Sequence, residues 1–278
     1  MRIGLVFWGF VLVLLSGLMA LEAMNIAVEN AWTLIWPLLL IVVGISILYS
    51  TLLSWREAQF ANHPHLQTIP LGTATSARIR IEHGSGRLNL SALSTEGSSD
   101  VLLTGTFGGG LRHHAQQVGG LLNVEMQPEV KRVVPVPWGS GDDLDWSFQL
   151  NPTIPLILDI ELGPAADTID LSGLQVTDLR IKTSTSPCQI TFPSGIPLIR
   201  ATIEVGGGGV KLNIPTAVSA RIRTEGGLAG IQIDETRFPR DGAYHKSPDY
   251  DVKLRGTNPP EFRLDLEIQV GMGSLTVL

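Results

Sequence analysis

Histidine pairs are the residues whose spacing comes nearest to a metal site. His63 and His65 are two residues apart, and His113 and His114 are adjacent. A zinc site needs three or four ligands at fixed spacing, and no Cys, Asp or further His recurs beside either pair. Adjacent side chains of a strand also point to opposite faces, so His113 and His114 would not share one ion. The favoured interpretation of each pair is a solvated segment, with zinc binding as the alternative.

A group of carboxylates raises the possibility of a calcium site. Asp142, Asp143 and Asp145 come just before Trp146, and Ca²⁺ prefers carboxylate oxygens. The stretch lacks the further ligands of an EF-hand loop, above all the glutamate at its twelfth position. We therefore predict a solvated acidic loop here, and no metal-ligating residue.

Residue types suited to nucleophilic catalysis are present, but not in a recognisable arrangement. Ser, His and Asp occur without a G-x-S-x-G elbow and without the strand, turn and helix that expose such a nucleophile. The single cysteine, Cys188, is expected to be a small buried apolar residue, and it fits a reducing compartment. Acid–base work by two carboxylates stays open, because the sequence does not report their separation. We predict no catalytic residue, no cofactor and a protein that is not an enzyme.

Glycine-rich stretches could cradle a phosphate. They comprise Gly84 and Gly86, Gly206 to Gly209, Gly226 and Gly227, and Gly271 and Gly273. A phosphate-binding loop ends in Lys followed by Ser or Thr and leads into a helix, whereas each stretch here leads into a second alternating strand. We interpret them as places where the backbone bends, because only glycine adopts positive φ without strain. Hairpin loops and solenoid corners both remain possible.

From residue 72 onward the hydrophobic pattern has a period of two, which indicates β-strands. Leu158, Ile160 and Leu162, for example, alternate with Asp159 and Glu161. Such alternation buries one face of a sheet and exposes the other.

One unit of strand, small-residue turn and strand recurs. It reads IRIEHGSGRLNL from position 79, ATIEVGGGGVKLNI from 201, ARIRTEGGLAGIQI from 220 and LEIQVGMGSLTV from 266. The isoleucines before the turns, Ile160, Ile181, Ile203 and Ile222, are 21, 22 and 19 residues apart, and Ile268 follows 46 residues later, or about two turns. A period of about 20 residues is typical of a β-solenoid, whose turns must stack to bury their apolar faces. We predict an all-β, solenoid-like domain over residues 72–278, with an irregular insert at about 107–145.

The N-terminal part has a different pattern. Residues 3–21 and 32–53 contain no charge and are long enough, as helices, to cross a hydrocarbon core of about 30 Å. Neither has the polar stripe of a soluble helix. We predict a transmembrane helical hairpin over residues 1–56 and a juxtamembrane linker over 57–71. A cleaved signal peptide is the alternative for the first span.

Charge distribution bears on topology and on partners. Arg2 and Arg56 flank the two spans, and the connector at 22–31 has no Lys or Arg, so both termini are expected in the cytoplasm. This places the C-terminal domain there too. The formal net charge of −6 argues against nucleic acid as a partner, because phosphate binding needs a basic face.

The hydrophobic runs GLVFWGFVLVLLSGL and WPLLLIVVGISIL resemble the transmembrane region of cell-wall-active-antibiotic response proteins of the LiaI and LiaF type. The ending VGMGSLTVL is similar to the end of their β domain and to the related adhesin-like, or toastrack, domains. The resemblance implies a membrane protein that tunes an envelope-stress two-component system, without catalysis and without an active site to transfer. The chain departs from the family pattern in having only two spans and in the insert at 107–145.

These observations predict a membrane-anchored regulatory scaffold. The lipid bilayer and a membrane-embedded sensor kinase, or another envelope-stress protein, are its expected partners, and unpaired strand edges would invite added strands. Two alternatives remain: self-association through stacked solenoid ends, as in domains similar to bactofilins, and an outward-facing adhesin-like domain.

Overall fold

The computed structural model describes residues 65–94, 100–129, 144–184, 187–226, 230–251 and 262–278. The chain divides into two compact units, residues 1–61 and 62–278, and the second is described here by itself. The predicted transmembrane hairpin, with spans at 3–21 and 32–53, lies outside the described residues. Among the residues that are described, no helix combines the length and the apolar character needed to cross a bilayer.

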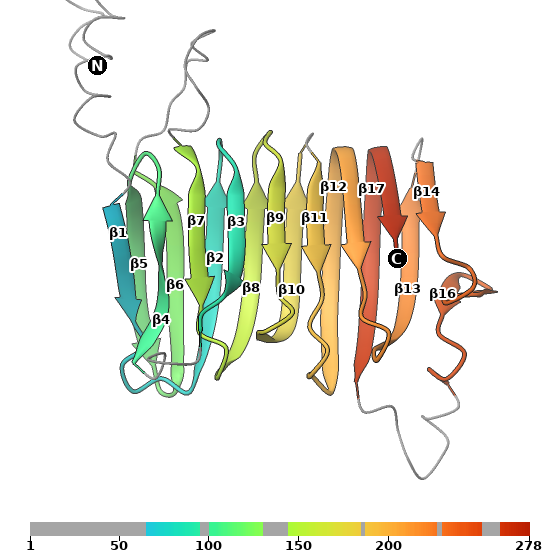
Figure 1. The fold of residues 1–278 in the computed structure, drawn as a ribbon, viewed down its shortest axis with the longest axis horizontal. Helices are drawn as coiled ribbons and strands as arrows, with labels where there is room; N and C mark the ends of the chain where they lie inside the picture. Colours follow the sequence, from blue (N-terminus) through green and yellow to red (C-terminus); the bar gives the residue numbers. More distant parts are fainter. Residues whose placement is uncertain (1–64, 95–99, 130–143, 185–186, 227–229, 252–261) are drawn as a thin grey trace, which may run out of the picture. The chain divides into compact units, whose positions relative to one another are not determined.

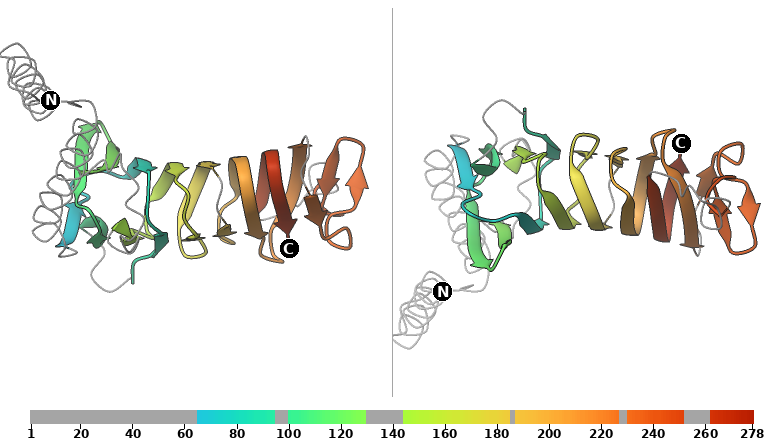
Figure 2. Two further views of the ribbon diagram at one scale, coloured as in Figure 1. Left: turned by 90° about the horizontal axis from the view of Figure 1, so that it is seen from above. Right: turned by 90° about the horizontal axis from the view of Figure 1, so that it is seen from below.

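The second unit is all-β and consists of two facing layers of stacked, mostly parallel strands (Figure 1 and Figure 2). In stacking order, the first layer contains β6 (Leu121–Pro128), β2 (Ser76–His83), β8 (Pro155–Leu162), β10 (Gln175–Thr183), the first half of β12 (Leu198–Asn213), the first half of β17 (Arg263–Val277) and β13 (Ser219–Gly226). The second layer contains β7 (Trp146–Leu150), β3 (Leu88–Ala92), β9 (Asp167–Asp170), β11 (Cys188–Thr191), the second halves of β12 and β17, and β14 (Gly230–Ile233). One strand from each layer forms a rung, and the two are joined along one rim, at the top of Figure 1.

Antiparallel strands cover one end of the stack and the first layer of the other. At one end β5 (Leu111–Val118) pairs with β6, β4 (Val101–Phe107) pairs with β7, and β1 (His65–Pro70) pairs with β4. At the other end the short strands β15 (Arg240–Asp241) and β16 (Tyr244–Lys246) form a hairpin against β13. We call the end with β13 and β14 the distal end.

The core lies between the layers and is built from the inward positions of the alternating strands. Ile81, Ile160, Ile181, Ile203 and Ile268 are in register on five neighbouring strands, and each is at most 1% exposed. Full burial of one such side chain contributes about 1.5–3 kcal/mol. This ladder confirms the period inferred from Ile160, Ile181 and Ile203.

Two details of the repeat prediction were wrong. Ile222 is opposite Leu266, so it lies two residues before the position in β13 that faces Ile268. The 46 residues before Ile268 do not add two further turns, because β17 inserts between β12 and β13. Alternation places side chains inside or outside, but it does not say which strand lies beside which.

Regular strands also occupy part of the regions expected to be irregular or linking. β5 and β6 form a hairpin within residues 107–145, and β1 lies within the expected linker at 57–71. In β5 every residue after Leu111 is exposed, so no apolar alternation marks it as a strand. Its conformation follows from pairing with β6 and not from burial of its own side chains.

Close backbone approach, not bending with positive φ, explains most of the rim glycines. A Cβ atom on Gly163 would lie 2.3 Å from the carbonyl oxygen of Gly84, and one on Gly271 would lie 2.7 Å from that of Gly206. Gly206 to Gly209 form a solenoid corner and not a hairpin loop, since they lie within β12, which turns over the rim from the first layer into the second as one continuous strand. Of the predicted bends, Gly86 has a left-handed φ of 89°.

Candidate interaction surfaces

Three of the four paired histidines, His65, His113 and His114, lie on strands at the end opposite the distal end. His113 and His114 are exposed on β5, opposite Met126 and Glu125 respectively, so their side chains point to different faces. His65 begins β1, and His63 lies outside the described residues. Across the described ranges, no group of three or more His, Cys, Asp or Glu side chains could hold a metal ion.

The described part of the predicted acidic loop is bound to an arginine. Asp145 accepts hydrogen bonds from the backbone N–H of Arg87 at 2.7 Å and from its Nε at 2.8 Å, and Nη2 of the same guanidinium lies 2.8 Å from Oδ2. Asp142 and Asp143 lie outside the described residues. The carboxylate of Asp145 therefore anchors the chain to the start of β3.

Cys188 is buried in β11, as predicted, with 3% of its surface exposed. Burial raises the pKa of its thiol to about 12, and the nearby carboxyl group of Asp167 adds to this shift. The thiolate is the nucleophilic and metal-binding form of cysteine. At neutral pH this side chain therefore behaves as a small apolar group.

A buried histidine next to a cavity of about 340 Å³ was not found from the sequence. His83 is 2% exposed, its ring centroid lies 4.8 Å from that of Trp146, and its Nε2 donates to the carbonyl oxygen of Leu144 at 3.1 Å. Burial lowers the pKa of His83, so the ring is neutral at pH 7. Its Nδ1 has no hydrogen-bond partner within the described part of the chain.

Asp167 is the second buried ionisable group that sequence reasoning missed. It is 3% exposed, and its Oδ1 accepts a hydrogen bond of 2.8 Å from the backbone N–H of Leu88. Its Oδ2 has no partner among the residues described. Burial raises the pKa of this carboxyl to about 7. The sequence did contain a signal: Asp167 comes two residues before Ile169, so both side chains point inward from β9.

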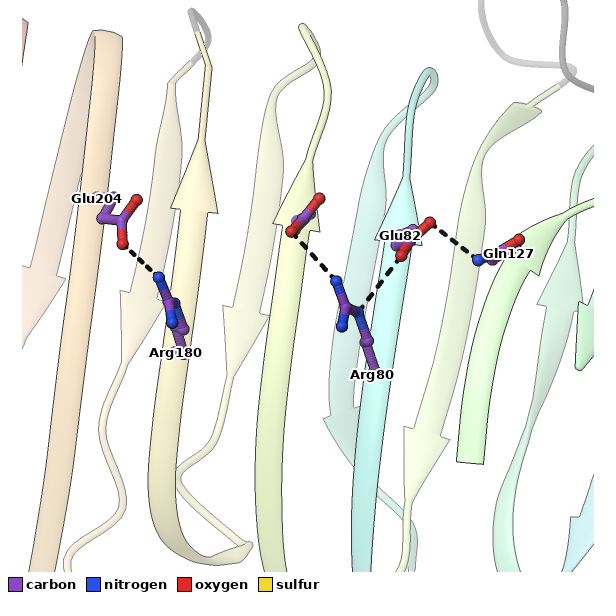
Figure 3. Close-up of polar contacts among 6 residues, drawn as sticks. Arg80, Glu82, Gln127, Arg180 and Glu204 are labelled. Atoms are coloured by element: carbon purple, nitrogen blue, oxygen red, sulfur yellow. Dashed lines mark hydrogen bonds and ion pairs between the residues drawn. The ribbon is translucent and has the colours of Figure 1, made fainter. Parts of the chain in front are cut away.

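The outer surface of the first layer, which we call the charged face, carries ion pairs that link neighbouring strands (Figure 3). Arg80 lies 3.3 Å from Glu82 on its own strand and 3.7 Å from Glu161 on the next strand. Arg180 is 2.8 Å from Glu204. These side chains are about one-third to two-thirds exposed, so each pair contributes at most about 1 kcal/mol.

The outer surface of the second layer, which we call the amide face, has a different composition. One row across it consists, in register, of Ser147, Asn89, Thr168, Gln189, Lys211, Thr276 and Gln232. Six of these seven side chains are uncharged amides or hydroxyls. This face can therefore offer hydrogen-bond donors and acceptors without desolvating many charges.

Comparison with protein families identifies this β stack. Residues 61–213 match the model of the N-terminal domain of toast_rack, DUF2154, which covers more than half of the chain. The chain belongs to this family. Residues 7–63 match the LiaF transmembrane domain, so this toast_rack protein is anchored in a membrane through its N-terminal part.

One of two similar solved structures shares the fold of this toast_rack protein. A candidate cell adhesion protein from Clostridium sporogenes ATCC 15579 superposes with a TM-score of 0.62 at 18% identity, over 77% of this chain and 99% of its own. A candidate adhesin from Bacteroides fragilis NCTC 9343 has a TM-score of 0.28 at 9% identity, over 78% of this chain and 99% of its own, which is too low to indicate the same fold. No curated protein matches the chain.

Proposed function

We propose that this toast_rack protein is a non-enzymatic membrane-anchored regulator, which modulates a cell-envelope stress response through protein contacts of its β stack. The observation that carries this proposal is the direct succession of two parts. The match to the LiaF transmembrane domain ends at residue 63, and β1 begins at His65. A rigid sheet surface tethered this closely to a bilayer is suited to meeting a partner in the same membrane.

The state of the reactive side chains supports a role without catalysis. Cys188 is buried with a raised pKa, His83 is neutral and packed on Trp146, and Asp145 is bound by Arg87. Catalytic acids, bases and nucleophiles need pKa values and access matched to a substrate. These three groups instead contribute to packing and to loop attachment.

The proposed partner is a membrane-embedded sensor kinase or another envelope-stress protein, met on the cytoplasmic side. The flanking residues Arg2 and Arg56 support that side through the positive-inside bias. The test is chemical crosslinking of the tagged full-length protein in its own membranes, followed by purification and identification of the partner. Recovery of a sensor kinase or another envelope-stress protein is expected, and recovery of none under efficient crosslinking would contradict the proposal.

An adhesin-like role on the outer side is the second candidate, favoured by the shared fold with the cell adhesion candidate from Clostridium sporogenes. Protease protection in sealed vesicles of known orientation separates the two roles. A β stack protected in right-side-out vesicles agrees with the cytoplasmic regulator, and one that is digested there agrees with the adhesin. Self-association, the third possibility, predicts sedimentation that depends on protein concentration.

A further inference from the structure

The two strands at the distal end differ in how their outer edges are covered. The outer edge of β13 is closed by the β15–β16 hairpin, with Arg221 opposite Lys246 and Ile222 opposite His245. The N–H of Ser247 also donates to the carbonyl oxygen of Ala220 at 2.9 Å. β14 pairs with β17 on one side, and no described strand pairs with its other edge (Figure 1).

The backbone groups of Ile231 and Ile233 point toward this open edge. The N–H of Asp234 donates to the carbonyl oxygen of Val277 in β17 at 3.1 Å. In a parallel strand, alternate residues direct their N–H and C=O groups to opposite sides. Gln232 therefore also faces β17, while the N–H and C=O groups of Ile231 and Ile233 face outward and are available to another strand.

The inward side chains of β14 are less covered than their neighbours in the same rows. Ile231 is opposite Leu275, and Ile233 is opposite Val277. Leu275 and Val277 are at most 1% exposed, whereas Ile231 is 37% exposed. A hollow of about 440 Å³ lies where β14 and β17 end, lined by residues 231–235 and 276–278. The stack thus ends here with aliphatic surface that a further strand would cover.

We propose that the free edge of β14 binds an extended segment of a partner protein as an added parallel strand. This deepens the proposed function, on which it rests, by naming the surface and the chemistry of the partner. The segment carries two aliphatic side chains two residues apart, which continue the rows of Ile231 and Ile233. A basic residue follows them, because Asp234 and Glu235 come directly after β14 and line the hollow.

The fold itself shows that the stack accepts such a strand. β17 inserts in parallel between β12 and β13, and it supplies Leu275 and Val277 at the spacing that the open edge of β14 requires. Among the described free edges of a second copy, β14 itself has two isoleucines at this spacing, but the acidic residues Asp234 and Glu235 follow them where the proposed segment has a basic residue. β5 is polar and exposed on both faces, and β1 (HLQTIP) has no two aliphatic residues at that spacing.

The test uses full-length protein in detergent micelles and a fluorescent peptide with the sequence GMGSLTVL followed by two lysines. Fluorescence anisotropy should report saturable binding to the wild type, and hydrogen exchange at residues 230–233 should slow when the peptide is bound. A control peptide with serine in place of the leucine and the valine should bind at least tenfold more weakly. Absence of saturable binding, or equal binding of both peptides, overturns the proposal.

Variants at one edge residue make the test specific. Ile231→Pro removes an outward N–H without touching the ladder to β17, and Ile231→Lys places a charge in the aliphatic row. Each should weaken peptide binding at least tenfold with little change in melting temperature, while Ile231→Val should bind like the wild type. Unchanged binding by folded Ile231→Pro and Ile231→Lys overturns the proposal. A wild-type dimer that Ile231→Pro dissociates also overturns it, because a second copy would then occupy the edge.

Failure here can be told apart from failure of the proposed function. If crosslinking recovers the same envelope-stress partner from wild type and from Ile231→Pro membranes, the regulatory role stands and the edge of β14 is not its contact. If neither yields such a partner but the peptide still binds in the expected way, the regulatory role falls while the strand-binding edge stands.

Discussion

The charged face and the amide face lie on either side of the same core, but their outward side chains differ in chemistry. Both layers direct aliphatic residues inward in the same registers, but Arg80 and Arg180 pair with carboxylates outside the first layer, whereas Asn89 and Gln189 occupy the outside of the second. The interior therefore determines the stacking, and the outward positions are free to differ. Interlocked charges also discourage another sheet from packing on the first layer, because they would have to be desolvated.

Removing residues 271–278 should have the largest effect, because it deletes the part of β17 that lies between β12 and β14 in the second layer. Leu275 and Val277 are almost completely buried, and each contributes about 1.5–3 kcal/mol by burial. We expect a loss of several kcal/mol in the free energy of unfolding, measured by urea denaturation. A truncated protein that unfolds at the parent's midpoint would show that the amide layer does not depend on this strand.

Gly163→Ala tests the rim that joins the two layers. Its Cβ atom would lie 2.3 Å from the carbonyl oxygen of Gly84, so the backbones of two rungs must move apart, at a cost of about 1–3 kcal/mol. Gly84→Ala is the matched control, because no atom lies within 4 Å of the added Cβ. Urea midpoints should fall for Gly163→Ala much more than for the control, and equal midpoints would contradict the close-approach explanation.

Asp167→Asn tests the buried carboxyl of the second layer through pH. The folded-state pKa of Asp167 is raised to about 7 by burial, so its contribution is fully present below pH 4 and is lost as the pH rises to about 7. His83, with its lowered pKa, acts in the opposite direction, and its contribution is lost as the pH falls below 6.5. The variant should be more stable than the wild type at pH 8, by about 1–3 kcal/mol, and should lose most of this advantage at pH 4. Urea unfolding at both pH values measures the difference, and a pH-independent difference would argue against a buried, titrating carboxyl.

The smallest effect should distinguish the two outer faces directly. Arg80→Ala removes a partner of Glu82 and Glu161, at a cost of about 0.2–1 kcal/mol that shrinks in high salt. Gln189→Ala, on the amide face, should have an effect that does not depend on salt. Urea unfolding at low and at high NaCl concentration provides the test, and equal salt dependence of both variants would remove the distinction between the faces.

Much of the fold was predictable, because burial imposes a period of two on every strand whose neighbours lie on both sides. Ile160, Ile181 and Ile203 are in register as their spacing indicated. β5 was not predicted as a strand, because an end strand with two exposed faces needs no alternation of apolar and polar residues. The buried positions of His83 and Asp167 were not predicted, because their roles depend on the side chains that surround them. His83 packs on Trp146, and Asp167 lies opposite Cys188.

By itself, the sequence determined that the region after residue 72 is β structure with aliphatic side chains inside, because alternation is a local property of each strand. Only the tertiary structure decided that β17 lies between β12 and β13 and that no strand among the described residues pairs with the outer edge of β14. All parallel strands with the same alternation present nearly the same surface to a neighbour. The order of the rungs therefore depends on chain connections and on contacts at the ends of the stack, which no local pattern encodes.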